Sequence, residues 1–324
     1  MRPSWLAMAA LLAASMAVAQ TKTSPTQAPA TNPSSPPPSG AANPSAAQSQ
    51  PAGGGHRMLQ AKSQEELKAY NDDIGITDPA QALAAADAFA AKFPNSELRA
   101  ALYIRAMNLY GQQNNADKSI EAGRKAIAAD PTNPVPLVQV ASALAESTRE
   151  TDMDRQQRLA EAAKDAQGAI DNVDTGLIVP PNAPADKVAA AKRSIVTMAY
   201  DTLGMVNMSK KDYAAAEQDL LKAADASKGA PEAVVYLRLS VAQDQQKKYP
   251  EALESANKAV QYAPDGSQAQ NLAKQQQVRL QKLIAAGSSG GGGVGLPSEI
   301  PAPAGPGSQP SQPTQQTQPK TPPR

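Results

Sequence analysis

The amino-acid sequence predicts an all-α protein in which consecutive helix pairs stack into a solenoid. Residues 63–286 are rich in Ala, Leu, Gln, Lys and Glu, which favour helices, and they lack the alternating apolar runs of β-strands. Within this region a pattern of aromatic and small residues recurs after 36 residues. The flanking segments are rich in Pro, Gly and Ser and have no apolar periodicity, so the folded body is expected between them.

The clearest internal repeat joins two tyrosines that begin related helices. Tyr213 and Tyr249 lie 36 residues apart. The same offset relates three further pairs, which are Ala216 and Ala252, Tyr200 and Tyr236, and Leu203 and Leu239. One helix pair is therefore written twice, which is the sequence signature of stacked repeats that bury their apolar faces against one another.

Five helix pairs and a last helix can be placed along the body. The expected units cover about 63–96, 100–133, 134–172, 197–230 and 233–266, and a polar capping helix covers 267–286. An insertion from Glu146 to Asp154 interrupts the third unit, and a break from Asp174 to Lys187 separates it from the fourth. Prolines 94, 131 and 264 follow helices closely, where a missing amide donor costs little and ends the helix.

This pattern resembles the tetratricopeptide repeat, which uses a large residue, Leu-Gly, an aromatic residue, then Ala and a closing Pro. The residues expected to pack the helices together in this way are Tyr103, Ser119, Tyr200, Leu203, Gly204, Tyr213, Ala216, Tyr236, Leu239, Tyr249 and Ala252. Met107 and Gln243 depart from the pattern, which prefers a small and an aromatic residue there. The resemblance implies a right-handed superhelical solenoid, a non-catalytic role in binding proteins, and an exported member of the bacterial envelope type.

Members of this family bind partners in a concave groove lined by the first helix of each unit. The resemblance places these residues in the groove: Ile104, Asn108, Gln112, Val138, Ser142, Asp201, Met205, Met208, Leu237, Val241 and Asp244. Members that grip a C-terminal carboxylate have Lys, Arg and Asn there, and only Asn108 conforms. We therefore expect an amphipathic helix or extended peptide of a partner protein, held by apolar anchors such as Met205 and Leu237.

Composition excludes several kinds of chemistry. The 31 basic and 30 acidic residues balance, so no net charge attracts nucleic acid. The chain has no Cys, and its one His is His56 in the Pro/Gly-rich segment, so thiol chemistry and common zinc sites are excluded. We expect no catalytic residue, no metal and no small-molecule cofactor. The alternative is a carboxylate-dependent hydrolase or ligand-binding protein that uses the irregular segment 174–187.

The two ends of the chain predict export and disorder. Residues 1–19 have a basic start, an apolar run and small residues before Gln20, which predicts a signal peptide cleaved after Ala19. An uncleaved anchor in the inner membrane is the alternative. Residues 20–62 and 287–324 predict disordered linkers. We expect a periplasmic or secreted scaffold without a membrane span in the mature chain, or alternatively a structural spacer that tethers two envelope layers.

Overall fold

The computed structural model describes residues 57–288, and within this range every regular element is a helix. The helices are α2 (Gln64–Ile74), α3 (Pro79–Lys92), α4 (Arg99–Gln112), α5 (Ala116–Ala129), α6 (Pro134–Ser147), α7 (Arg155–Asn172), α8 (Ala185–Ser209), α9 (Tyr213–Ala226), α10 (Ala233–Gln245), α11 (Tyr249–Tyr262) and α12 (Gln268–Ser288). The predicted all-helical fold class is confirmed. The predicted signal peptide, residues 20–56 of the first linker and the tail from residue 289 lie outside the described residues.

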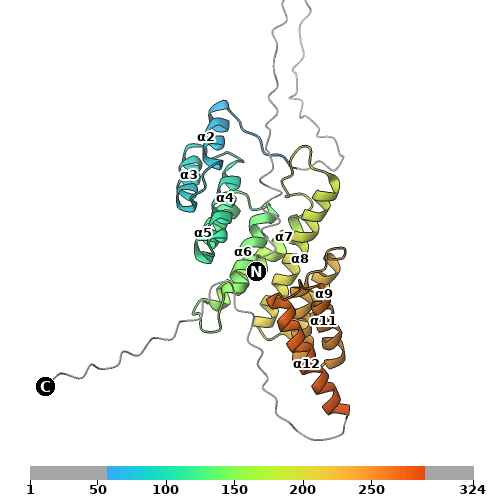
Figure 1. The fold of residues 1–324 in the computed structure, drawn as a ribbon. Coiled ribbons are helices and arrows are strands. Elements are labelled where there is room, and N and C mark those ends of the chain that lie inside the picture. The colour runs from blue at the N-terminus through green and yellow to red at the C-terminus, as the bar shows by residue number, and fades with distance from the viewer. Residues whose placement is uncertain (1–56, 289–324) are drawn as a thin grey trace, which may run out of the picture.

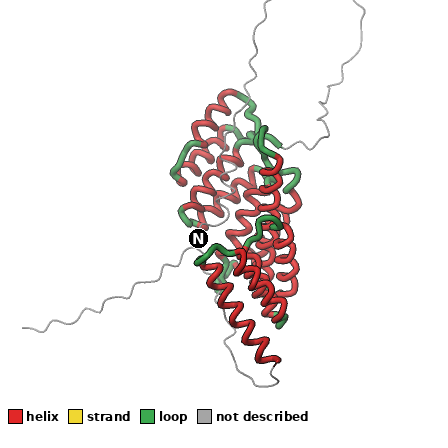
Figure 2. Tube along the Cα trace, turned by 45° about the vertical axis from the view of Figure 1, so that its right-hand side comes forward, coloured by secondary structure: helices red, strands yellow, loops and turns green. Residues whose placement is uncertain are grey.

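The helices pack in consecutive pairs, and the pairs stack in chain order (Figure 1). We call α2, α4, α6, α8 and α10 the first helices and α3, α5, α7, α9 and α11 the second helices. From α4 onwards each first helix packs most extensively on the second helix of its own pair, and less on the second helix before it. In Figure 1 α2–α5 lie on one side of the molecule and α9–α12 on the other, with α6–α8 between them. Figure 2 shows that short loops join these helices.

Small residues lie where the two helices of a pair approach most closely. Ala216 and Ala252 are completely buried. A Cβ atom on Gly204 would lie 2.6 Å from Cγ of Leu220, so the backbone of α8 touches α9 where a larger residue would not fit. At the corresponding position of the next pair, the Ser240 hydroxyl donates a hydrogen bond of 2.7 Å to the carbonyl of Ala252. Close packing therefore recurs with the repeat.

The residues predicted to pack the repeats all lie at least partly inside the stack. Tyr103, Gly204, Ala216, Leu239 and Ala252 are buried, whereas Ser119, Tyr200, Leu203, Tyr213, Tyr236 and Tyr249 are partly buried. The hydroxyl of Ser119 donates to the carbonyl of Met107 at 3.0 Å, which joins α5 to α4. That of Tyr103 donates to Asp87 at 2.9 Å, which joins α4 to α3.

The turn between the two helices of a pair has the same backbone geometry in three pairs. Asn114, Lys211 and Lys247 end α4, α8 and α10 with φ angles of 56°, 63° and 63°. A residue in the left-handed conformation at this point ends a helix. Glycine adopts this conformation most easily, but here two lysines and an asparagine do so. The recurrence of one turn explains why the second helix follows the first at the same spacing in these pairs.

The fourth pair begins earlier than its predicted start at residue 197, because α8 extends back to Ala185. The added turns are held by Val188 and Ile195, which are buried against residues of the third pair such as Leu137 and Val138. The predicted break from Asp174 to Lys187 is therefore shorter than expected. Its loop is also packed, because Leu177 and Val179 are buried.

Residues 57–62 form a strap that crosses the stack, although they were expected to be disordered. The Arg57 guanidinium pairs with the buried carboxylate of Asp130 at 2.7 Å and donates to the hydroxyl of Thr132 at 3.1 Å. The amide of Val179 donates to the carbonyl of Arg57 at 3.2 Å. In Figure 1 the strap runs from α2 to the loop before α8. It therefore links the first pair to the junction of the third and fourth.

Among residues 57–288, no helix combines the length and the apolar content that crossing a bilayer requires.

We predict that Gly176→Ala destabilises the protein by about 1–3 kcal/mol. The new Cβ would lie 1.8 Å from the carbonyl oxygen of Thr132, and a backbone atom cannot rotate away. The free energy of unfolding from urea denaturation checks this. Gly287→Ala is the matched control, because no atom lies within 4 Å of its new Cβ, and it should cost nothing. Equal stability of the two variants would contradict the close contact at residue 176.

We predict that Arg57→Ala lowers the free energy of unfolding by about 1–3 kcal/mol, because it leaves the buried Asp130 carboxylate without its cation. Hydrogen exchange at the Val179 amide should also speed up. Lys68→Ala, which breaks an exposed pair with Asp72, is the control and should cost under about 0.5 kcal/mol. If both variants keep the exchange rate of the parent at Val179, the strap does not hold the loop.

Candidate functional site

Four of the residues predicted to line the groove are buried in packing contacts, so their assignment to a free surface is wrong. Ile104 lies in the core around α4, and Val138 is completely buried against α8. Leu237 packs against Ala259 and Ala273. Asp244, 8% exposed, forms an ion pair with Arg279 of α12. The reason is that neighbouring helices of the stack cover these positions of the first helices.

The other predicted groove residues keep some contact with solvent. Gln112 is exposed, and Asn108, Ser142, Asp201, Met205, Met208 and Val241 are partly buried. Met205 and Met208 both pack against the core, which reduces the apolar surface they can offer. The face shared by the first helices is thus more polar than the sequence indicated.

Polar residues occupy the position two residues after the first large packing residue of several first helices. Arg105 follows Tyr103 by two, and Arg238 follows Tyr236 by two. Gln139 holds the same place in α6. Nε of Arg105 and Nε2 of Gln139 are buried without a hydrogen-bond partner. These donors were missed, although the recurrence of a long polar side chain at one register was visible in the sequence.

Three successive first helices bring an ionic cluster together around Arg238. We call Glu146, Asp201, Glu232 and Arg238 the acidic cluster; they come from α6, α8, the residue before α10, and α10. Arg238 forms an ion pair with Asp201 and lies 3.9 Å from a carboxylate oxygen of Glu146. The side chains of Arg238 and Asp201 are only 15% and 14% exposed. Glu232 also feels the charge of Arg238, so three carboxylates share one guanidinium and an excess of two negative charges remains when all are ionised.

The surroundings disfavour the charges of this cluster. Loss of water contact raises the pKa of Glu146, Asp201 and Glu232, and the charge of Asp201 raises the pKa of its two neighbours further. Arg238 opposes the rise at all three carboxyls. Oδ1 of Asp201 is buried without a hydrogen-bond partner. The negative charges are therefore incompletely compensated within the described chain.

Glu146 gives the cluster its opening to solvent. Its side chain is 47% exposed, yet loss of water contact is the largest cause of its raised pKa. Glu146 is therefore the member of the cluster that a ligand in solution can contact directly. The sequence indicated that Glu146 begins a loop insertion, but α6 continues to Ser147. Glu146 therefore lies on the face shared by the first helices.

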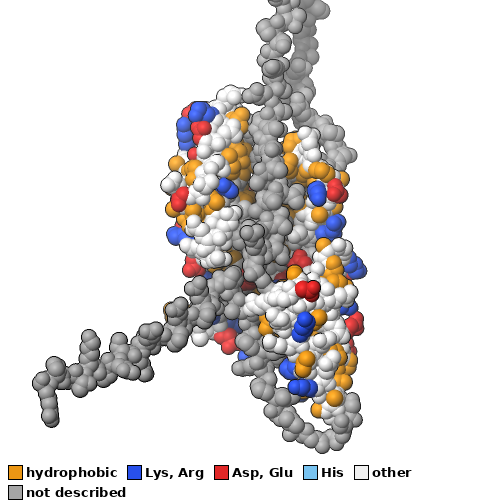
Figure 3. Space-filling model, viewed as in Figure 1, with side chains coloured by type: hydrophobic (Ala, Val, Ile, Leu, Met, Phe, Trp, Pro, Cys, Tyr) orange, Lys and Arg blue, Asp and Glu red, His pale blue; other side chains and the backbone are white. Residues whose placement is uncertain are grey.

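The acids of the irregular segment 174–187 are dispersed. Asp174 is 80% exposed and pairs with Lys192 at 2.9 Å, and Asp186 is exposed in the first turn of α8. Within residues 57–288 no three acidic or imidazole side chains are arranged to hold a metal ion. His56 lies outside the described residues. In Figure 3 the visible face carries Lys and Arg side chains interspersed with Asp and Glu.

Comparisons with known proteins point to the same repeat. Residues 199–229, which cover the end of α8 and α9, match the family model described as tetratricopeptide repeat. A comparison with curated proteins found no match.

Solved structures with a similar arrangement include three proteins. PilF of Pseudomonas aeruginosa is 14% identical, with 70% of this chain and 96% of that chain covered and a TM-score of 0.44. TTC0263, a thermophilic TPR protein of Thermus thermophilus, is 15% identical, with 68% and 98% covered and a TM-score of 0.39. MamA is 18% identical, with 57% and 88% covered and a TM-score of 0.37. Similarity at this level supports no statement about function.

The match at residues 199–229 identifies one tetratricopeptide repeat in the chain, and the other helix pairs resemble it in their packing and in the small residues at their close contacts.

Proposed function

We propose that this protein is a non-catalytic scaffold that binds a segment of a partner protein on the face of its first helices. A Lys or Arg side chain of the partner would pair with the exposed carboxylate of Glu146, on the side of the cluster formed by Asp201 and Glu232. The observation that carries it is the uncompensated negative charge of the acidic cluster, which one guanidinium alone does not balance. The fold is typical of protein–protein interaction scaffolds.

The proposed partner differs from the one that the sequence indicated. Apolar anchoring through Leu237 is unavailable, because that side chain is buried against Ala259 and Ala273. Met205 and Val241 remain partly exposed near the cluster along α8 and α10, so they can contact the aliphatic stem of a basic side chain. A basic residue with small apolar neighbours therefore suits this surface better than an amphipathic helix.

We also propose that the protein acts outside the cytoplasm, in the envelope or the secreted space. The support is the sequence of residues 1–19, with its basic start, short apolar run and small residues at 17 and 19. N-terminal sequencing of the protein purified from its cells tests this: a start at Gln20 supports export with cleavage, and an intact Met1 on soluble cytoplasmic protein contradicts it.

We predict that short peptides with a central Lys or Arg bind, and that the same peptides with Gln or Glu at that position do not. Peptides of about eight residues and fluorescence anisotropy suit the measurement. Glu232→Gln should weaken binding of the Lys peptide about tenfold, because one carboxylate partner is lost. Glu97→Gln removes an exposed carboxylate elsewhere and is the matched control. Equal binding of Lys and Gln peptides would contradict the proposed function.

We predict opposite effects of pH on binding and on stability. In the folded chain the pKa values of Glu146, Asp201 and Glu232 are raised, so the native state holds protons that the unfolded chain has released. The stability that these groups contribute is thus lost as pH rises through their folded pKa values. Cation binding needs the ionised carboxylates, so affinity should fall as pH is lowered through these raised pKa values. Titration at constant ionic strength checks this, and a flat profile argues against the cluster.

We also predict that Glu232→Gln stabilises the free protein at neutral pH while it weakens binding of the Lys peptide. Removing a desolvated charge that Asp201 repels relieves an unfavourable interaction. The urea midpoint of the variant should rise. Asp201→Ala should instead destabilise, because Arg238 loses its closest carboxylate. A lower midpoint for Glu232→Gln would mean that this carboxylate serves stability rather than binding.

A further inference from the structure

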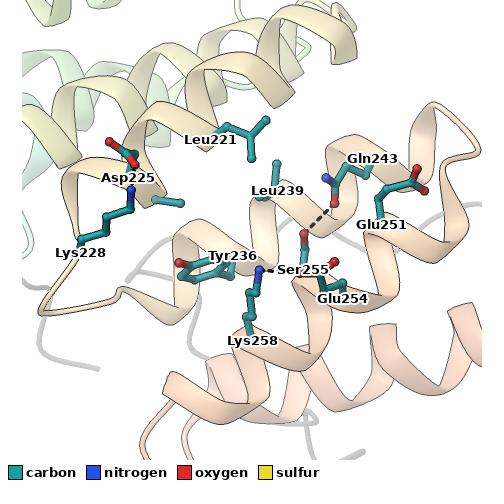
Figure 4. A pocket seen from close by; sticks show the side chains of 11 residues that line it. Leu221, Asp225, Lys228, Tyr236, Leu239, Gln243, Glu251, Glu254, Ser255 and Lys258 are labelled. Atoms are coloured by element: carbon teal, nitrogen blue, oxygen red, sulfur yellow. Dashed lines mark hydrogen bonds and ion pairs between the residues drawn. The ribbon is translucent and has the colours of Figure 1, made fainter.

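A recess lies between α9, α10 and α11, and none of its lining residues belongs to the acidic cluster (Figure 4). Its volume is about 310 Å³. Leu221 and Leu239 line its centre, and Tyr236 forms one side. Leu221 is 48% exposed, which is unusual for a large aliphatic side chain in this structure. The recess therefore presents apolar surface that the described residues do not cover.

Polar side chains close the ends and rim of the recess. Gln243 and Ser255 are buried, and the Ser255 hydroxyl donates a hydrogen bond of 2.7 Å to the side-chain oxygen of Gln243. These two side chains therefore do not need a polar ligand. Ion pairs of Asp225 with Lys228 and of Glu254 with Lys258 flank the opening. Because these rim charges are paired, the apolar centre is the part that gains most from an occupant.

The size of the recess favours an occupant that is already attached to the chain. Its volume is at the lower end of the range of ligand pockets, roughly 300–1,000 Å³. It holds one or two aliphatic side chains, each worth about 1.5–3 kcal/mol on burial. A stable interface between separate proteins usually buries about 1,200–2,000 Å² in total, which such a recess alone cannot supply. A tethered segment needs far less affinity, because a short flexible linker gives it a millimolar effective concentration.

We propose that residues 294–301 of the same chain occupy this recess, with Leu296 and Ile300 against the exposed Leu221 and the partly exposed Tyr236. After Ser288 the chain has only three large apolar residues, and all of them lie in this segment. The segment contains prolines 297 and 301, and proline lowers the conformational entropy that a chain loses when it binds in an extended form.

The linker is long enough to reach the recess. Leu280 of α12 packs against Ala252 of α11, which is adjacent to the rim residue Glu251. Ser288 lies eight residues further along α12, about 12 Å at the rise of a helix, and crossing one helix adds about 10 Å. The stretch from Ser288 to Leu296 spans at most about 27 Å when extended. It consists mainly of Gly, so it bends without strain.

Disulfide trapping in the full-length chain tests this inference, since the natural sequence contains no Cys. Glu251→Cys on the rim is combined with Ser298→Cys, which lies between the two proposed anchors and leaves both intact. The control combines Ser298→Cys with Gln281→Cys, an exposed position on α12 close to where the segment leaves the helix. An undirected segment meets residue 281 at least as often as residue 251.

The proposal expects the 251–298 disulfide to form about tenfold faster than the 281–298 disulfide under mild oxidation. Changing Leu296 and Ile300 together to Ser should remove the preference. Equal rates for the two pairs overturn the proposal, as does a preference that survives the loss of both anchors. A 251–298 disulfide that joins two chains instead of one also overturns it, because the occupant is then a second copy. Peptide binding at the acidic cluster is measured separately and does not depend on the result.

Discussion

The two helices of a pair approach so closely that only small side chains fit between them, and the rest of the structure depends on this contact. Gly204 leaves no room for a Cβ atom beside Leu220, and Ala216 and Ala252 are completely buried. Large side chains fill the space between neighbouring pairs: Leu239 of α10 clusters with Leu220 and Ala223 of α9 in the preceding pair. Each pair thus lacks a core of its own, and stability is shared between neighbours. The same contact fixes which residues of the first helices remain on the surface.

The sequence predicted the helix pairs well, because their determinants are local. The spacing of Tyr213 and Tyr249 marks two second helices that both start at these residues in the structure. Periodicity in the sequence does not reveal contacts between residues that are far apart in the chain. The backward extension of α8 depends on Val188 and Ile195 meeting the third pair, and the strap depends on Arg57 meeting Asp130, 73 residues away. Nothing in the neighbourhood of Arg57 in the sequence indicates that partner.

The site was harder to predict than the fold, for a related reason. Ile104 and Leu237 follow the family register for a groove, but neighbouring helices cover them. The acidic cluster combines Glu146 of α6, Asp201 of α8, and Glu232 and Arg238 at α10, so its members are spread over a long stretch of the chain. Charge balance over the whole chain also conceals it, because the 31 basic residues nearly equal the 30 acidic ones. Only the packed structure shows that the carboxylates of this cluster outnumber its one guanidinium.

The strap has a mechanical consequence. Tension applied to the chain ahead of Arg57 first meets the ion pair with Asp130 and the hydrogen bond from Val179, both of which lie away from the first helix pair. The load then enters the stack at its centre, and α2 and α3 are shielded from it. A repeat array pulled from its end usually loses its terminal unit first, since that unit has a neighbour on one side only. In this protein the first helix pair bears no load until the ion pair between Arg57 and the buried Asp130 breaks.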